Sequence, residues 1–198
     1  MLRFYALVII LFIYPGYLYA QTTKVTQLNA KRIQTNKGGM MVLGSWAIAN
    51  MAMGAIGMKK NTGTQRYFHQ MNLMWNSVNL ALAGSGLYSA YTSSPSQFNL
   101  EQGYKEQQKI ERILLVNAGL DVVYIAGGLV LKQRSVLASA KRPELMNGYG
   151  KSLMLQGGFL LGFDSILFLL HKQHHNDWMQ LLGGLQATTS GFRYVGSF

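Results

Sequence analysis

Two apolar segments decide the fold of this chain: residues 113–131, ILLVNAGLDVVYIAGGLVL, and residues 152–170, SLMLQGGFLLGFDSILFLL. Each is long enough for a helix that crosses a bilayer, and each carries one carboxylate near its middle, Asp121 in the first and Asp164 in the second. A lone ionised carboxylate at that depth costs about 3 kcal/mol on insertion scales. We therefore expect both side chains to face protein or water, each with a partner.

The composition also indicates a membrane protein. Of the 198 residues, 49% are hydrophobic and only 13% are charged, which is few charges for a water-soluble domain of this size. The net charge of +11 is spread over short groups of Lys and Arg that bracket uncharged segments. We expect no nucleic-acid binding, because that function gathers basic residues on one face or in one run. The chain has no cysteine, which excludes disulfides and thiolate chemistry.

The first twenty residues have the pattern of a secretory signal peptide. Arg3 precedes the apolar residues 4–14, Pro15 and Gly16 break this run, and Ala20 is a small residue just before the expected cut. A retained anchor is the alternative, but the apolar run is short for a spanning helix, which needs about 20 residues. We predict that residues 1–20 are removed and that residues 21–198 form one domain.

Four spans are predicted in this domain. They cover about residues 38–58, 71–92, 113–131 and 152–170. The polar and basic residues 21–37 should form a surface helix that leads into the first span. Asn99 and Gln102 have capping-box spacing, and no breaker separates them from Ile113, so one long helix should stand partly in water before it enters the bilayer. Pro143 should open the helix of the fourth span.

The tail carries a second start signal, because Asp177 and Gln180 repeat the capping-box spacing. Residues 178–189 contain an apolar patch, but a helix of that length reaches only about 18 Å. It should lie at the interface or pack back on the bundle. The predicted fold class is therefore an all-α integral membrane four-helix bundle with a cleaved N-terminal signal and a short amphipathic C-terminal helix.

Helical periodicity places the polar residues of each span on one face, as with Asn72, Asn76 and Asn79 in the second span. We predict that the four faces converge on a common interior, since small and polar residues mediate helix packing in membranes. The predicted interior residues are Asn50, Asn76, Asn79, Asn117, Asp121, Gln156 and Asp164. Two interpretations stay open: the polar groups only hold the helices together, or the two Asp line a wet cavity and bind or relay a cation.

Three histidines form a second candidate site. His171, His174 and His175 have the spacing with which one helix face presents two imidazoles to a metal ion, and Asp177 could add an oxygen. The pattern has no fixed fourth ligand and no glutamate base, so we expect no cofactor and keep a metal at these histidines as an alternative. Gly-rich phosphate loops, HExxH and GxSxG are absent from the sequence. A non-enzymatic protein is favoured, although a membrane-embedded metal enzyme that uses these histidines stays open.

Several short runs resemble a family of small four-span membrane proteins from Bacteroidota with no assigned activity. They are Gly44-Ser45-Trp46-Ala47 with Asn50, Met74-Trp75-Asn76-Ser77-Val78-Asn79, Asn117-Ala118-Gly119-Leu120-Asp121, Gly148-Tyr149-Gly150-Lys151, Gln156-Gly157 and Phe163-Asp164. The resemblance covers most of the mature chain and implies a membrane location and a four-span fold. It implies no activity.

Together these patterns predict a non-enzymatic membrane protein whose polar interior binds a small cation, a proton or a lipid headgroup. The alternative is a structural or assembly subunit of a membrane complex. The expected partners are the lipid bilayer and another membrane protein or a second copy of the chain. Lys and Arg number nine on the side of the termini and eight on the other, so this count does not orient the chain. The signal peptide does, and it places both termini in the periplasm, with the chain in a bacterial inner membrane.

Overall fold

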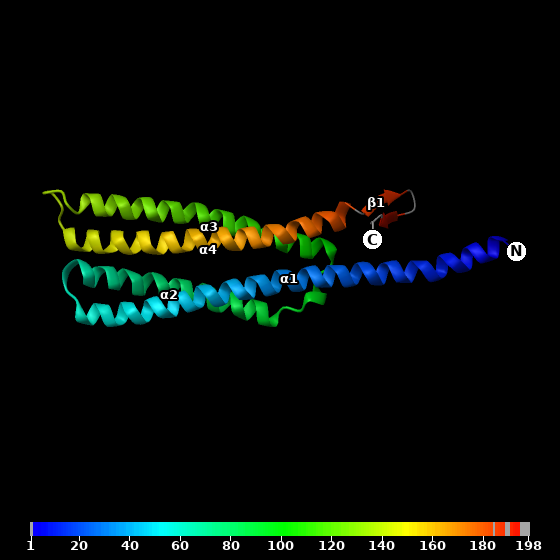
Figure 1. Ribbon diagram of the computed structural model, residues 1–198, viewed down its shortest axis with the longest axis horizontal. Helices are drawn as coiled ribbons and strands as arrows, with labels where there is room; N and C mark the ends of the chain where they lie inside the picture. Colours follow the sequence, from blue (N-terminus) through cyan, green and yellow to red (C-terminus); the bar gives the residue numbers. More distant parts are fainter. Residues whose placement is uncertain (1, 184, 189–190, 195–198) are drawn as a thin grey trace.

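The computed structural model describes residues 2–183, 185–188 and 191–194, with side chains for residues 22–183. In this part of the chain, four long helices form two antiparallel hairpins that lie side by side (Figure 1). The first hairpin is α1 (Leu2–Lys60) with α2 (Gly63–Thr92), and the second is α3 (Leu100–Arg134) with α4 (Pro143–Gly183). A short 3-10 helix, η1 (Pro95–Gln97), precedes α3, and an antiparallel strand pair, β1 (Leu185–Thr188) with β2 (Gly191–Tyr194), follows α4. The predicted helical fold is confirmed, and the strand pair is the departure from it.

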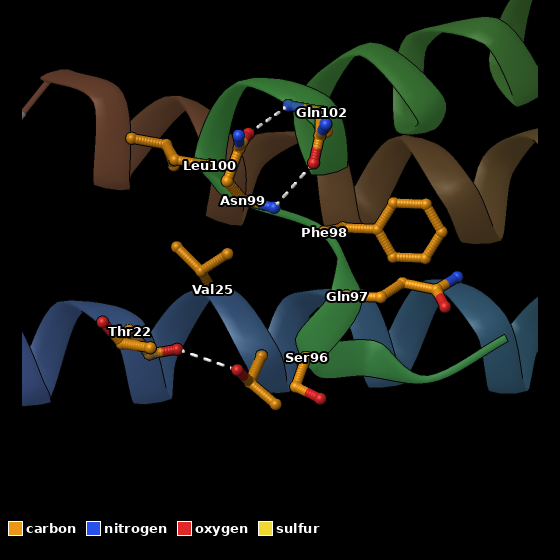
Figure 2. Close-up of a pocket in the computed structure, with 9 residues that line it drawn as sticks. Thr22, Val25, Ser96, Gln97, Phe98, Asn99, Leu100 and Gln102 are labelled. Atoms are coloured by element: carbon orange, nitrogen blue, oxygen red, sulfur yellow. Dashed lines mark hydrogen bonds between the residues drawn. The ribbon is translucent and has the colours of Figure 1, made fainter.

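Both helix-start signals upstream of the tail are confirmed. The Asn99 side chain accepts a hydrogen bond from the backbone N–H of Gln102 at 2.9 Å, and the Gln102 side chain accepts one from the backbone N–H of Asn99 at 3.1 Å (Figure 2). Two of the unpaired N–H groups at the start of α3 are thereby satisfied. From this cap, α3 runs without a break to Arg134, and Pro143 is the first residue of α4.

The predicted separate helix in the tail is wrong. α4 continues through Asp177 to Gly183, and residues 185–188 form β1 instead of helix. No Gly or Pro lies between Leu170 and Asp177 to stop the helix. Asp177 has a different role from the predicted cap, because its carboxylate pairs with the Lys31 ammonium group of α1 at 3.1 Å.

The predicted signal peptide forms the first part of α1. This helix begins at Leu2 and passes Pro15 and Gly16, which break the apolar run of the sequence, without interruption. It then continues through residues 21–37, the predicted surface helix, into the first predicted span. Cleavage after Ala20 stays a prediction.

Three helical segments are long and apolar enough to cross a membrane: Thr22–Lys60, Leu100–Arg134 and Pro143–Gly183. Among the residues that the structure describes, α2 does not meet this criterion, although it contains the predicted second span. Three buried asparagines, Asn72, Asn76 and Asn79, lower its apolar character.

The distribution of side chains is the reverse of that in a water-soluble protein. Large apolar side chains such as Ile48, Val116 and Ile166 are 57–63% exposed. Amides and carboxylates fill the interior, as with Asn76 and Asp121, which are at most 2% exposed. A soluble fold would bury the first set and expose the second. The exposed apolar faces are therefore suited to contact with lipid, as in a membrane protein.

Glycines bring the helices into close contact. A Cβ atom on Gly128 of α3 would lie 2.6 Å from the Gly150 carbonyl oxygen of α4, and a Cβ on Gly150 would lie 2.6 Å from the Gly128 oxygen. Gly148 joins the two hairpins in the same way, since a Cβ there would lie 2.5 Å from the Thr64 carbonyl oxygen of α2. Backbones that approach this closely gain packing contacts that larger residues would prevent.

The helices are longer than a bilayer crossing requires. α3 has 35 residues and is about 52 Å long, whereas a bilayer's hydrocarbon core is about 30 Å thick. Residues 22–37, 95–112 and 171–183 form one end of the bundle, which we call the headpiece. Its apolar core consists of Val25, Leu28, Trp178 and Leu181, against which Leu100 and Tyr104 pack. Trp178 and Leu181 of the tail's apolar patch thus pack back on the bundle, which is the second of the two predicted environments.

The glycine contacts generate a prediction with a neighbouring control. We expect Gly128→Ala to lower the free energy of unfolding in detergent by about 1–3 kcal/mol, because the new methyl group meets the Gly150 carbonyl. Gly127→Ala should have no destabilising effect, since nothing lies within 4 Å of its Cβ position. Denaturant titration followed by circular dichroism measures both. Equal stability of the two variants would contradict the close contact.

Candidate functional site

An amide network joins α1, α2 and α4 in the interior, and Asn72 is its centre. The Asn72 side-chain nitrogen donates to the side-chain oxygen of Asn50 at 3.0 Å and also faces the Asn50 carbonyl oxygen at 3.3 Å. Its side-chain oxygen accepts a hydrogen bond from the Gln156 amide of α4. One side chain therefore links three helices.

The network continues to either side of this centre. The Trp46 indole N–H of α1 donates to the Gln156 side-chain oxygen at 3.0 Å, and the Trp46 ring stacks on Phe159 of α4 with centroids 3.8 Å apart. Along α2, the Asn76 amide donates to the Asn72 carbonyl at 2.8 Å, and the Asn79 amide donates to Asn76 at 3.4 Å. Donors and acceptors in this network face one another, so it satisfies itself internally.

A pair of carboxyl groups occupies the contact between α3 and α4. Asp121 is 2% exposed and Asp164 is 5% exposed, and the two side chains lie close enough to interact. Asn117, one turn before Asp121 on α3, also lies near Asp164. One oxygen of this pair, Asp121 Oδ2, is buried and has no hydrogen-bond partner among the described residues. Unlike the amide network, this group is incompletely satisfied.

A glycine lets the two carboxylates meet. A Cβ on Gly157 of α4 would lie 2.9 Å from the Asp121 carbonyl oxygen, so α3 and α4 touch through backbone at this level. Two turns further along α4, Asp164 then lies opposite the α3 face that carries Asp121 and Asn117. Two features of the sequence therefore bring the carboxylates together: the positions of the two Asp residues, and the glycine that allows their helices to touch.

The predicted polar residues therefore gather in two groups rather than around one common interior. One group is the amide network, which contains Asn50, Asn76, Asn79 and Gln156. The other lies at the contact between α3 and α4 and contains Asn117, Asp121 and Asp164. The reason is that α3 packs along α4 and, within the described residues, its backbone does not approach that of α2. Side chains provide a contact between these two helices, where Trp75 meets Tyr124 edge to face at 4.7 Å.

The three histidines of the headpiece point to three different partners. His171 accepts the Gln107 amide on its carbonyl oxygen at 2.7 Å, His174 lies 3.0 Å from the Thr35 hydroxyl, and His175 lies 3.1 Å from a Glu111 carboxylate oxygen. Within the described part of the chain, no three metal-ligating side chains come together. The three histidines are close together along α4, but they contact residues of two different helices: His174 contacts α1, and His171 and His175 contact α3.

Burial lowers the pKa of one histidine in the headpiece, His171. The pKa of His171 falls from 6.5 to about 4 because the ring is buried and because His174 and Arg32 add unfavourable positive charge nearby. The folded state thus binds fewer protons at this site than the unfolded state. Its contribution to stability is complete above about pH 6.5 and is lost as the pH falls toward 4.

A surface pocket of about 480 Å³ opens in the headpiece between residues 22–26 of α1 and residues 96–102 (Figure 2). Thr22, Val25 and Thr26 of α1 form one wall, and the segment around Phe98 and Asn99 forms the other. None of the described side chains that line it is titratable. The pocket lies apart from the amide network and from the pair of Asp121 and Asp164.

Comparison with known proteins gives a family. Residues 42–165 match the sequence pattern of a family of unknown function, DUF6992. The chain belongs to this family. No curated protein and no solved structure matches it.

The DUF6992 segment contains both polar groups. The amide network from Asn50 to Gln156 and the pair of Asp121 and Asp164 lie inside residues 42–165, whereas His171 and the tail lie outside. The resemblance seen in the sequence to a family without assigned activity is thereby confirmed at that level. Every run that carried the resemblance lies within the matched residues.

Sequence reasoning missed two residues that the structure makes central. Asn72 fell on the right stripe but was not among the predicted interior residues, yet it has more interhelical hydrogen bonds than its neighbours. Gln107 was not singled out at all, although it is fully buried and joins α3 to His171. The available signal was that Gln107 is an uncharged amide in a segment otherwise rich in charged residues, which could have indicated a buried position.

Loss of the Asn72 side chain, at the centre of the amide network, should lower the free energy of unfolding more than loss of the Asn79 side chain at its end. We expect Asn72→Ala to lower the free energy of unfolding by about 1–3 kcal/mol, because Asn50 and Gln156 lose their partner while staying buried. Asn79→Ala, which removes a single 3.4 Å contact, should cost about 0.6 kcal/mol or less. Thermal or denaturant unfolding in detergent distinguishes the two. A larger loss at Asn79 would show that Asn72 is not the centre.

The shifted histidine predicts a pH-dependent stability. Between pH 8 and pH 5, His171 should account for a loss of about 2 kcal/mol in the free energy of unfolding, because the unfolded state gains the proton first. His171→Gln should flatten this dependence. Parallel slopes for His171→Gln and wild type would contradict the assignment.

Proposed function

We propose that this chain is a non-enzymatic multi-pass membrane protein in which Asp121 and Asp164 together hold one monovalent cation, the smallest being a proton. The observation that carries the proposal is the close approach of two buried carboxyl groups, one of which has an oxygen, Asp121 Oδ2, without a hydrogen-bond partner among the described residues. Intramembrane carboxylates are expensive to bury and mark functional sites by default.

Charge explains why this pair needs a cation. Two ionised carboxylates in contact repel each other strongly in a medium of low dielectric constant. One positive charge between them removes the repulsion, and carboxylate oxygens are suitable ligands for a hard cation. Asn117 lies near Asp164 but carries no charge, so it does not remove the repulsion between the two carboxylates.

The amide network has a different role in this proposal. Its donors and acceptors satisfy one another, and they tie the first hairpin to α4. We assign it to helix association, which membrane proteins achieve with interhelical hydrogen bonds of modest strength. The site of binding is thereby restricted to Asn117, Asp121 and Asp164, a subset of the residues predicted from the sequence.

The proposal includes a location. Four crossings in the inner membrane of a bacterium follow if α2 crosses alongside the apolar α1, against which it packs. The start of α1 and the end of α4 lie at the same end of the molecule, as four crossings require (Figure 1). With the signal peptide removed, that end would be periplasmic. The alternative of an assembly subunit requires another chain that survives gentle extraction, and a second copy is one such partner.

The cation site can be tested by infrared difference spectroscopy on protein in nanodiscs. We expect the carbonyl band of about one protonated carboxyl group to disappear when NaCl is added or when the pH is raised from 5 to 9. Asp121→Asn and Asp164→Asn should each abolish this change, because each removes half of the site. Asp177→Asn, which alters an ion-paired carboxylate of the headpiece, is the matched control and should retain it.

Two outcomes would overturn the proposal. One is a wild-type spectrum that responds to neither NaCl nor pH, because the carboxyl pair is then a fixed packing contact. The other is a response that survives in both Asn variants, because the titrating group then lies elsewhere. A co-purified partner chain in stoichiometric amount, together with a silent spectrum, would favour the assembly subunit.

A further inference from the structure

Unpaired positive charge is concentrated at the end of the molecule where the two hairpins turn, which we call the connection end. Lys59, Lys60 and Arg66 surround the turn between α1 and α2. Lys132, Arg134, Lys141, Arg142 and Lys151 surround the turn between α3 and α4. All eight side chains are exposed, and within the described part of the chain none forms an ion pair.

The headpiece, at the other end, neutralises much of its positive charge. Four lysines there lie within 4 Å of a carboxylate, at distances from 2.6 to 3.8 Å. These lysines are Lys31, Lys105, Lys109 and Lys172. The two sides carry similar numbers of basic residues, nine on the side of the termini and eight on the other. They differ in how many of these residues are paired with a carboxylate, since the unpaired cations lie mainly at the connection end.

The connection end is one continuous surface. Both turns lie at the same end of the helices (Figure 1). They are fixed to each other because Gly148 of α4 lies against the Thr64 carbonyl oxygen of α2, and because the Tyr149 hydroxyl donates to the Gln70 side chain at 3.3 Å. The two basic groups are therefore held in a fixed relation to each other.

The loop between α3 and α4 adds an apolar element to this surface. Val136 is 81% exposed and Leu137 is 56% exposed, and Arg134 and Lys141 flank them in sequence. Exposed aliphatic side chains bracketed by cations are typical of segments that lie at the boundary between headgroups and acyl chains. A nucleic acid or an acidic protein would match the cations but would leave these apolar side chains without a matching surface.

We propose that the connection end binds the headgroups of anionic phospholipids, with Val136 and Leu137 inserted at the acyl boundary. A basic residue near an anionic membrane surface attracts it with about 1 kcal/mol, so three such residues change lipid affinity by about a hundredfold. Anionic lipid gives the cytoplasmic leaflet its negative surface potential. The proposal therefore orients the connection end toward the cytoplasm without reference to the signal peptide, and it does not depend on the cation site.

Native mass spectrometry of the full chain in detergent tests this surface with defined lipids. The protein is titrated with phosphatidylglycerol or phosphatidylcholine, and the bound lipid is counted. We expect phosphatidylglycerol to bind at least tenfold more tightly, and 0.5 M salt during titration to weaken it. The triple variant Arg134→Gln, Lys141→Gln, Arg142→Gln should lose this preference.

A matched triple variant of the headpiece, Lys24→Gln, Lys105→Gln, Lys109→Gln, should keep it. Equal binding of the two lipids by wild type, or an equal loss in both triple variants, would overturn the proposal. If the first triple variant does not fold, as judged by circular dichroism, the salt dependence of the wild-type preference decides. A preference that is insensitive to salt would then exclude an electrostatic headgroup site.

Discussion

The structure depends on one constraint: within a bilayer, a polar group must find its partner inside the protein, because the lipid offers none. The amide network follows directly from it. Asn72, Asn50 and Gln156 each place both a donor and an acceptor against a neighbour, so the interior of the first hairpin and α4 needs no water. The same constraint makes the carboxyl pair stand out, because two acceptors facing each other cannot satisfy one another without an added positive charge. The amides explain how the helices associate, and the carboxylates require something further.

The arrangement of helices explains why these two kinds of group are separate. Glycines allow backbone contact between α3 and α4 at Gly128 and Gly150 and again at Gly157, so this hairpin closes on itself along its length. α2 reaches α4 through Gly148 at the connection end and through the amides further along. α4 is therefore shared by both groups, which accounts for its high content of buried polar and small residues. It also explains how α2 can belong to the bundle without a segment apolar enough to meet the spanning criterion, since its asparagines face α1 and α4.

The sequence predicted which residues are interior but not how the helices meet. Periodicity identified the polar face of each span, and Asp121 and Asp164 are indeed buried and adjacent. Periodicity does not say which faces touch, so it could not separate Asn117 from Asn76 or rank Asn72 above Asn79. The tail was misread for a related reason: Asp177 has cap spacing, but its tertiary partner Lys31 lies 146 residues away in sequence. The histidines show the same limit, because spacing on one helix cannot reveal that α1 and α3 engage different rings.

The environment of the carboxyl pair favours binding over transport through the protein. From Asp164 toward the headpiece, the next buried side chain on α4 is Leu167, which packs against Gly39 of α1. His171 follows one turn later, and its ring is buried against Gln107 of α3. A cation that left the pair along α4 would thus meet an aliphatic side chain and then a neutral, buried imidazole, neither of which offers the carboxylate oxygens that hold it. A cation bound between Asp121 and Asp164 is therefore better described as an integral part of the α3–α4 contact, which halves the negative charge of the pair and couples the packing of this hairpin to the ion that occupies it.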